Sequence, residues 1–178
     1  MLHNGIQILT VDKVYKKIQS LNANFGNVRR HFTCAVIDFH DEYVYCGTKT
    51  GDVFEINIEK AIYKRVGPLK KLFSLGITAI RLLSNGDILV GTGEGKLARI
   101  SIQNMTLLKQ DEVMGSVTSL ALTADFTHFF CGTSQSNIYW INADNLTPEL
   151  RNTCHYDRIN DVAFPFGYSE VFATASTN

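Results

Sequence analysis

Three glycines and a lysine lie close together in VGTGEGKLA, Val90 to Ala98, and residues of these types build phosphate-binding loops. A P-loop needs a glycine five residues before its Gly-Lys glycine and a Ser or Thr directly after the lysine. Here those positions hold Val90 and Leu97. From Lys96 onward polar and apolar side chains alternate, as in a strand, whereas a helix must follow a phosphate loop. The pattern therefore argues against a nucleotide site.

Histidine, serine and cysteine chemistry has equally little support. His31 and His128 have no partner at the spacing of metal ligands, and no G-x-S-x-G elbow is present to carry a nucleophilic serine. No two cysteines form a C-x-x-C pair, so a zinc or redox site is not indicated. Two disulfides are arithmetically open, but without an export signal we expect reduced thiols packed among strands. The cysteines are Cys34, Cys46, Cys131 and Cys154.

Composition limits the classes of partner. The chain has 178 residues, of which 45% are hydrophobic and 19% charged, and this predicts a packed domain rather than disorder. The formal net charge is zero, so no general attraction to nucleic acid or to an anionic membrane is expected. No apolar run approaches the roughly 20 residues of a transmembrane helix, and the N-terminus lacks the pattern of a secretory signal. We expect no nucleic-acid partner, no membrane partner and no cofactor.

A repeated segment accounts for the glycines. YVYCGTKTGDVFEIN, DILVGTGEGKLARIS and HFFCGTSQSNIYWIN each contain an apolar run, a Gly-Thr pair, a small polar turn and an alternating run. The Gly-Thr pairs lie 44 and 41 residues apart. A tight turn recurs in this way, whereas a nucleotide loop does not, and glycine supplies the positive φ that hairpin turns often need. The predicted structural turn residues are Gly47, Gly51, Gly91, Gly95 and Gly132.

Two further sets of strands flank this repeat. Mostly apolar segments begin at Phe32, Ile77, Val117 and Ile159, as expected for inner strands covered on both faces. Charged segments follow the alternating runs, as expected for outer edge strands that resist pairing with other chains. The opening NGIQILTVD matches SNIYWINAD, the third strand of a unit. Four short strands in a period of about 40–45 residues are typical of a WD-repeat blade, so the predicted fold class is all-β, a segment of a WD-repeat β-propeller.

The predicted blades do not complete a ring. The expected units are the end of a preceding blade (1–31), three full blades (32–76, 77–116 and 117–158) and the first half of the next blade (159–178). Propellers close with about 4–8 blades. We therefore expect about four four-stranded blades, two of them partial, in an open arc of a larger propeller, and a chain that is a piece of a longer protein. The alternatives are a ring sealed by its two half-blades and closure by another chain.

The units resemble degenerate WD repeats. In that family the third strand commonly ends in Trp-Asp, whereas the matching pairs here are Ile-Asn, Ile-Ser and Ile-Asn. The Gly-His that usually precedes the inner strand survives only as Cys154-His155. The position of His155 in the repeat predicts a structural role, a hydrogen bond that closes its blade. With most of the family's polar network absent, apolar packing must carry more of the stability.

Two stretches resemble a more specific family. VGPLKKLFSLGITAIRLL and CHYDRINDVAFPFGYSEVFATAS are similar to the corresponding blades of cilia- and flagella-associated WD-repeat proteins. The resemblance covers about Asn4 to Asn178 and a middle section of the two-propeller family member. It implies a non-enzymatic scaffold, a microtubule inner protein that supports doublet microtubules in the axonemes of motile cilia and flagella. The implied partners are tubulin, other ciliary microtubule-associated proteins and the remaining blades of the same longer protein, and the implied location is the cytoplasm and its cytoskeleton.

Basic side chains before inner strands and on outer strands are the candidates for partner contact. Microtubules are acidic, and with zero net charge an interface has to use local patches. The same charges also suit solvated sheet edges. The alternative function is a propeller hydrolase or carbohydrate-binding module, but no acidic or histidine position recurs across the units, so the scaffold is favoured. The candidates are Arg29, Arg30, Lys64, Arg65, Lys70 and Lys71.

Overall fold

A computed structural model of the chain describes residues 5–70, 72–152, 155–167 and 170–177. In this part of the chain every regular element is a β-strand, and the strands form five separate antiparallel sheets. Three sheets have four strands and two have only two strands. The predicted all-β class is therefore confirmed. Within the described residues no helix is long and apolar enough to cross a membrane.

The complete sheets follow one another along the chain. The first contains β3 (Phe32–Ile37), β4 (Tyr43–Thr48), β5 (Val53–Asn57) and β6 (Ile62–Gly67). The second contains β7 (Ile77–Leu82), β8 (Ile88–Thr92), β9 (Lys96–Ile100) and β10 (Leu107–Glu112). The third contains β11 (Val117–Leu122), β12 (His128–Thr133), β13 (Ile138–Asn142) and β14 (Pro148–Asn152). The two-stranded sheets are β1 (Gln7–Asp12) with β2 (Lys17–Asn22), and β15 (Ile159–Ala163) with β16 (Ala173–Ser176).

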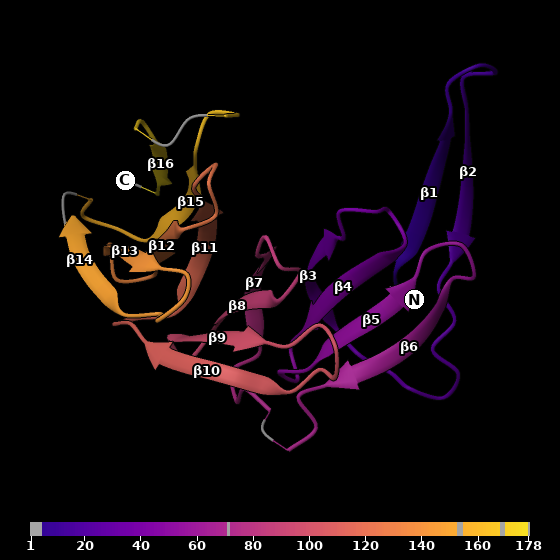
Figure 1. Ribbon diagram of the computed structural model, residues 1–178, viewed down its shortest axis with the longest axis horizontal. Helices are drawn as coiled ribbons and strands as arrows, with labels where there is room; N and C mark the ends of the chain where they lie inside the picture. The colour runs from indigo at the N-terminus through magenta and orange to yellow at the C-terminus, as the bar shows by residue number, and fades with distance from the viewer. Residues whose placement is uncertain (1–4, 71, 153–154, 168–169, 178) are drawn as a thin grey trace.

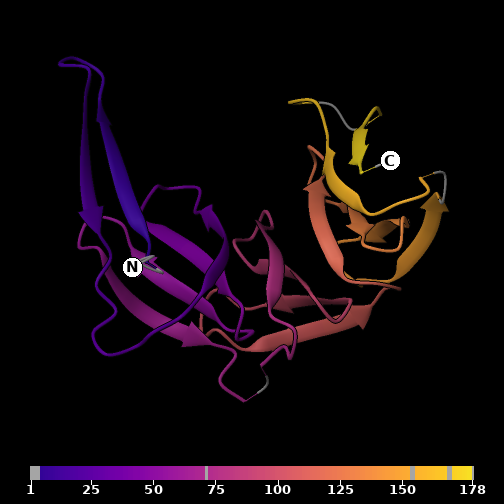
Figure 2. The same ribbon diagram turned by 180° about the vertical axis from the view of Figure 1, so that it is seen from behind.

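The sheets fan out along an open arc. Within each sheet sequential strands pair with each other, and the first strands β3, β7, β11 and β15 lie next to one another from sheet to sheet. Figure 1 shows the crescent from one side and Figure 2 from the other, with the β1–β2 hairpin and the β15–β16 pair at opposite ends. The ends do not meet, so the predicted open arc is confirmed and the ring sealed by its own two ends is not formed.

Much of the hydrophobic core lies between neighbouring sheets. Leu89 and Leu97 of the second sheet pack in one cluster with Leu120 and Phe129 of the third, and all four side chains are fully buried. A second cluster joins the first and second sheets in the same way. Because each sheet buries its faces against its neighbours, an array of this kind gains stability from nearest-neighbour contacts.

Three of the predicted turn glycines lie inside strands instead. Gly47, Gly91 and Gly132 belong to β4, β8 and β12 and have no positive φ. A Cβ atom at Gly91 would lie 2.3 Å from Val117 Cγ1 of the next sheet, and Gly47 and Gly132 face the first residue of the next inner strand in the same way. These glycines are therefore needed for close packing between sheets, not for chain reversal, and the turn prediction for them was wrong.

The turns between second and third strands use other residues. Gly51 and Gly95 have φ of +92° and +85°, and Ser136 takes the same place with φ of +64°. This is the left-handed region, which glycine enters without steric cost. The threonine of the Gly-Thr pair fixes the turn, because Thr92 Oγ1 accepts a hydrogen bond of 2.9 Å from the backbone N–H of Lys96.

The turns between third and outer strands share a second geometry. Each contains a residue with φ between 49° and 59°, always four positions after a side chain that accepts a backbone hydrogen bond in the turn. The accepting residues are Asp12, Asn57, Ser101 and Asn142. The sequence match of NGIQILTVD with SNIYWINAD therefore lies two residues out of register, since Asp12 corresponds to Asn142 in the structure.

Candidate interaction surfaces

The glycine-rich segment that first suggests a phosphate site forms an ordinary hairpin. Lys96 is the first residue of β9, and its Nζ lies 2.9 Å from Glu94 Oε2. Glu94 also accepts a hydrogen bond from the Ser74 hydroxyl, and these contacts hold the pKa of its carboxyl below the usual value, with the Lys96 contact the largest cause. The lysine is thus paired with a carboxylate inside the chain, and a strand rather than a helix follows the loop.

Two of the predicted partner-binding arginines are paired within the first sheet. Arg30 Nε lies 2.9 Å from Oδ2 of Asp52, a buried carboxylate. Arg65 bonds the buried Glu55, its neighbour across the β5–β6 ladder, with Nη2 3.0 Å from Oε1, and it also donates to the carbonyl of Ile102 at 2.9 Å. The hydrogen bond with Glu55 raises the pKa of Arg65. The positive charges of Arg30 and Arg65 are therefore compensated by carboxylates of the same chain.

The other basic candidates differ in how freely they face the solvent. Lys64 Nζ lies 4.0 Å from Glu55 Oε1 and 4.4 Å from the centre of the Tyr43 ring. Arg29 and Lys70 are exposed, and Lys71 lies outside the described residues. Among the candidates that the structure describes, Arg29 and Lys70 are therefore the least compensated.

The histidines serve different local purposes. His155 Nε2 lies 2.8 Å from Thr174 Oγ1 of β16, so this half-buried ring bonds within its own two-stranded sheet. The ring of His128 stacks on Trp140 with centroids 4.7 Å apart and planes 9° apart. Among the described residues no three His, Cys, Asp or Glu side chains are grouped so that they could hold a metal ion.

Carboxylates in the loops after inner strands stabilise turns. Asp38 Oδ1 accepts the backbone N–H of Glu42 at 2.8 Å. The hydroxyl of Thr123 and the N–H and hydroxyl of Thr127 all donate to Asp125, and they lower its pKa to about 2. These acids are held by local hydrogen bonds, which is the behaviour expected of Asp in turns.

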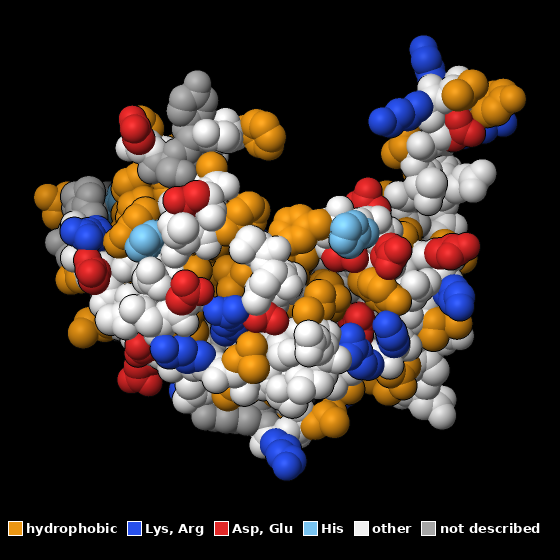
Figure 3. Space-filling model, viewed as in Figure 1, with side chains coloured by type: hydrophobic (Ala, Val, Ile, Leu, Met, Phe, Trp, Pro, Cys, Tyr) orange, Lys and Arg blue, Asp and Glu red, His pale blue; other side chains and the backbone are white. Residues whose placement is uncertain are grey.

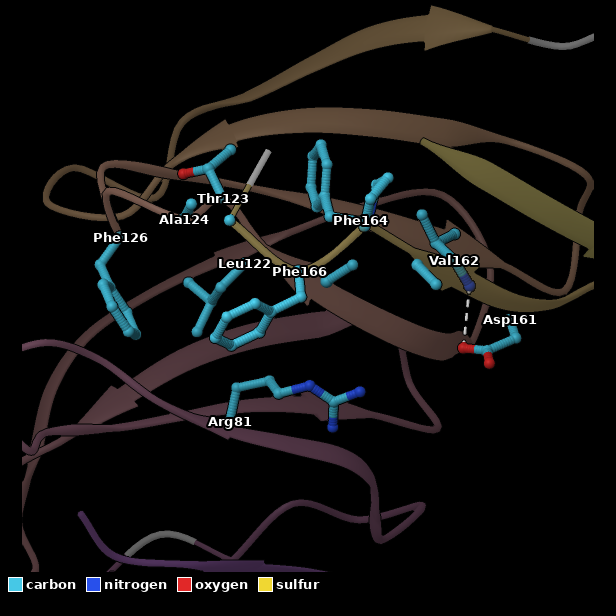
Figure 4. A pocket seen from close by; sticks show the side chains of 13 residues that line it. Arg81, Leu122, Thr123, Ala124, Phe126, Asp161, Val162, Phe164 and Phe166 are labelled. Atoms are coloured by element: carbon cyan, nitrogen blue, oxygen red, sulfur yellow. Dashed lines mark hydrogen bonds between the residues drawn. The ribbon is translucent and has the colours of Figure 1, made fainter. Parts of the chain in front are cut away.

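The inner strands end at a surface pocket of about 620 Å³ (Figure 4). Its lining is mainly apolar, with Phe126 and Phe166 on its walls and the guanidinium group of Arg81 at one side. The lining hydroxyl, Thr123 Oγ1, donates to Asp125 at 2.6 Å, and the lining carboxylate of Asp161 accepts the N–H of Val162 at 2.9 Å. Because the lining is mainly apolar, the pocket suits contact with an apolar group.

Comparison with solved structures shows the class of fold. No family model matches the chain. Over 97% of its length the chain superposes on 51% of a chain in the crystal structure of the mitotic checkpoint complex, with a TM-score of 0.80 and 12% identity. It superposes on the crystal structure of the RRP9 WD40 repeats with a TM-score of 0.75 and 15% identity, covering 85% of this chain and 46% of that one. The chain is a partial WD40 β-propeller.

Comparison of sequences is more specific. The chain is 42% identical over 177 residues to cilia- and flagella-associated protein 52 of Chlamydomonas reinhardtii, covering 97% of this chain and 28% of that protein. The proteins of the same name from Homo sapiens and Sus scrofa are 35% and 34% identical over 174 residues, with the same coverage. The chain is therefore homologous to a section of cilia- and flagella-associated protein 52, and it spans about 28% of the length of these curated relatives.

Sequence reasoning missed two features of the surface. The cross-strand pairing of Glu55 with Arg65 follows from the register of β5 and β6, so a correct alignment of the two strands would have indicated that this arginine is compensated. The exposed Val14 and Tyr15 at the tip of the β1–β2 hairpin also went unnoticed. Aligning the four hairpins on the residue that accepts the turn hydrogen bond, rather than on matching letters, would have shown that this tip differs from the others.

Proposed function

We propose that the chain is a section of a non-enzymatic scaffold, a microtubule inner protein that supports doublet microtubules in the axonemes of motile cilia and flagella. The homology over 97% of the chain to proteins named for their association with cilia and flagella carries this proposal. The geometry favours it, because the inner-strand pocket has an apolar lining and the loop carboxylates are engaged in turns. Surfaces of this kind bind proteins by shape and local charge.

The proposed partners are tubulin, other ciliary microtubule-associated proteins and the remaining blades of the same longer protein. In this proposal the units 32–76, 77–116 and 117–158 are whole blades, β1–β2 belongs to the end of a preceding blade and β15–β16 to the first half of the next. Arg29 and Lys70 are the proposed contacts for acidic partner surfaces, since both are exposed. We place the working protein in the axonemal cytoskeleton.

The test is retention on doublet microtubules. The whole protein that contains this chain, tagged and expressed in ciliated cells, should remain with doublets after detergent and salt extraction of isolated axonemes. Arg29→Glu combined with Lys70→Glu should lower the retained fraction about threefold or more, because the two substitutions place carboxylates against an acidic partner surface, and like charges that face each other weaken binding. The matched control is Lys109→Glu, which reverses an exposed charge on the outer strand β10.

Two results would contradict the proposal. Recovery of the tagged protein only in the soluble fraction of ciliated cells would remove the scaffold function itself. Equal retention of the double variant, the Lys109→Glu variant and the unaltered protein would leave the scaffold in place but would remove Arg29 and Lys70 from its interface.

A further inference from the structure

The β1–β2 hairpin departs from the other hairpins at its tip. Four turns join a third strand to an outer strand, and their registers agree, because Val11 pairs with Ile18 just as Ile100 pairs with Leu107. The residue with positive φ falls at the same place in each turn and is Lys16 in this hairpin. The four tips can therefore be compared position by position, and the comparison does not depend on sequence similarity.

The inward positions of this turn are apolar in the complete sheets. The residue with positive φ is Ala61, Met105 or Leu146, each at most 3% exposed, and the residue just after the turn acceptor is Ile58, Ile102 or Ala143. In the β1–β2 hairpin these two positions hold Lys16 and Lys13, which are exposed. Lysine cannot bury its ammonium group in such a position without a partner.

The solvent-facing positions of the turn differ in the opposite direction, with apolar residues in place of polar ones. In the complete sheets the two residues at the outer tip are polar and exposed: Glu59 and Lys60, Gln103 and Asn104, Asp144 and Asn145. In the β1–β2 hairpin they are Val14 and Tyr15, which are 83% and 73% exposed. The polarity of this one turn is therefore inverted, with lysines where the others are apolar and apolar side chains where the others are polar.

The inverted tip is held in shape and stands clear of the arc. Asp12 Oδ1 accepts the backbone N–H groups of Val14 and Tyr15 at 2.9 and 3.0 Å, which fixes the turn. The hairpin projects from one end of the crescent (Figure 1), and Figure 3 shows basic and hydrophobic side chains gathered at its tip. Within the described residues Lys13, Lys16 and Lys17 have no ion-pair partner. The fixed turn thus presents two apolar side chains together with three lysines and one carboxylate, that of Asp12, which lies opposite Lys17 across the β1–β2 pair and leaves a positive excess.

We propose that this tip is a docking element for an acidic protein surface, one that places carboxylates around a shallow apolar depression. Val14 and Tyr15 enter the depression, and Lys13, Lys16 and Lys17 face the carboxylates. Charge complementarity identifies the chemistry of the partner, and a preformed turn lowers the ordering cost of binding. The inference rests on the proposed scaffold function in one respect: both take the partner to be a protein.

A protein surface fits these features better than a lipid bilayer does. Val14 and Tyr15 together supply less apolar carbon than a single myristoyl chain, and one such chain binds a bilayer only marginally. Directional contacts between ammonium and carboxylate groups make up that deficit on a protein, where carboxylates can be placed around a depression.

The test uses the purified chain and a defined probe, so it does not depend on cilia. The probe is a dye-labelled synthetic peptide of alternating leucine and glutamate, compared by fluorescence anisotropy with the same peptide in which glutamine replaces glutamate. We expect saturable binding of the glutamate peptide, weakened about fivefold or more by the glutamine replacement and weakened again when salt rises from about 50 to about 300 mM. Val14→Ser with Tyr15→Ser, and Lys13→Gln with Lys16→Gln and Lys17→Gln, should each weaken it about fivefold or more.

The matched control is the equivalent tip of the first sheet. Glu59→Ser with Lys60→Ser changes two exposed residues in the same turn geometry and should leave binding unchanged, and circular dichroism should show every variant folded. The proposal is overturned if the unaltered chain does not bind the glutamate peptide, if the tip variants bind as well as the control, or if anionic phosphatidylserine vesicles bind the tip more tightly than the peptide does. If the purified chain binds the glutamate peptide but the whole protein is absent from doublet microtubules, the proposed function is refuted and the docking proposal stands.

Discussion

The second sheet and the β1–β2 hairpin contain the same structural unit in two different surroundings. Ile100, at the end of a third strand, is fully buried, whereas Val11, at the equivalent position of the hairpin, is 59% exposed. Both side chains belong to a third strand paired with an outer strand through the same turn geometry. Burial in this fold is therefore set by whether complete sheets flank the strand, rather than by the strand's own sequence.

The second sheet and the hairpin also differ in how much their apolar side chains contribute to stability. The second sheet has a sheet on either side of it and keeps its apolar side chains within the core clusters. The hairpin lacks that cover and carries exposed apolar residues along its length, among them Leu9, Ile18 and Leu21. In an array stabilised by nearest neighbours, a unit without a covering sheet contributes less to the stability of the chain.

The largest expected contrast comes from truncating the two equivalent side chains. Ile100→Ala should lower the free energy of unfolding by about 2–5 kcal/mol, because a fully buried side chain leaves a cavity. Val11→Ala should change it by less than about 0.5 kcal/mol, because the side chain is largely in water. Guanidinium denaturation followed by circular dichroism measures both values. Equal losses of unfolding free energy for the two variants would mean that the hairpin is covered in solution, and would contradict the expected difference.

A smaller effect is expected where two sheets approach each other most closely. Gly91→Ala adds a Cβ that would lie 2.3 Å from Val117 Cγ1, so overpacking should cost about 1–3 kcal/mol of unfolding free energy. Gly5→Ala, next to the hairpin, meets nothing within 4 Å and is the control. Adding Val117→Ala to Gly91→Ala should cost less than the two separate effects combined, as a double-mutant cycle reveals. Additive costs would rule out this contact as the cause.

The last expected effect is absent at neutral pH: a dependence of stability on alkaline pH that arises in the sheets and not in the hairpin. Burial raises the pKa of Cys46 to about 12, and burial also raises the pKa of Cys131. Above about pH 9 the unfolded thiols ionise while the folded ones keep their protons, so the free energy of unfolding should fall by about 1.4 kcal/mol per pH unit for each thiol. Below that pH both states hold the proton and the contribution to the slope vanishes.

Denaturation at a series of alkaline pH values tests this slope. Cys131→Ala should remove the share of one thiol and make the decline less steep, although the smaller side chain lowers stability at every pH. Identical slopes for the unaltered chain and the variant would show that Cys131 ionises as easily in the folded state as in the unfolded state.

Much of the architecture could be predicted from the sequence because it repeats. The alternation of apolar residues and the recurring Gly-Thr pairs indicate strand, turn and strand at a constant spacing, and the four-stranded sheets follow from this. The role of Gly91 could not be predicted in the same way, because its decisive neighbour Val117 lies in the next sheet. Glycine is used both for positive φ and for close approach, and only the spatial neighbour distinguishes the two uses.

The candidate interaction residues were harder to predict for a related reason. An exposed lysine and a paired arginine look alike in a sequence, but Arg65 lies opposite Glu55 across a strand pair, and Arg30 reaches Asp52 on a different turn. The inverted polarity of the hairpin tip was missed because aligning NGIQILTVD with SNIYWINAD by residue type places the two turns two residues out of register. Compensation of charge and exposure of apolar groups both depend on register, which is a property of the folded sheet.

The glycine in each second strand also fixes how closely the following sheet can approach. In β16 that position is held by Ala175, which pairs with Asp161 just as Gly91 pairs with Ala79. A methyl group thus occupies the notch that receives Ile77, Val117 or Ile159 elsewhere. A strand that packs against this face must therefore begin with a smaller residue or lie further away. The methyl group of Ala175 thus limits which strands can pack here and sets the distance to the next sheet.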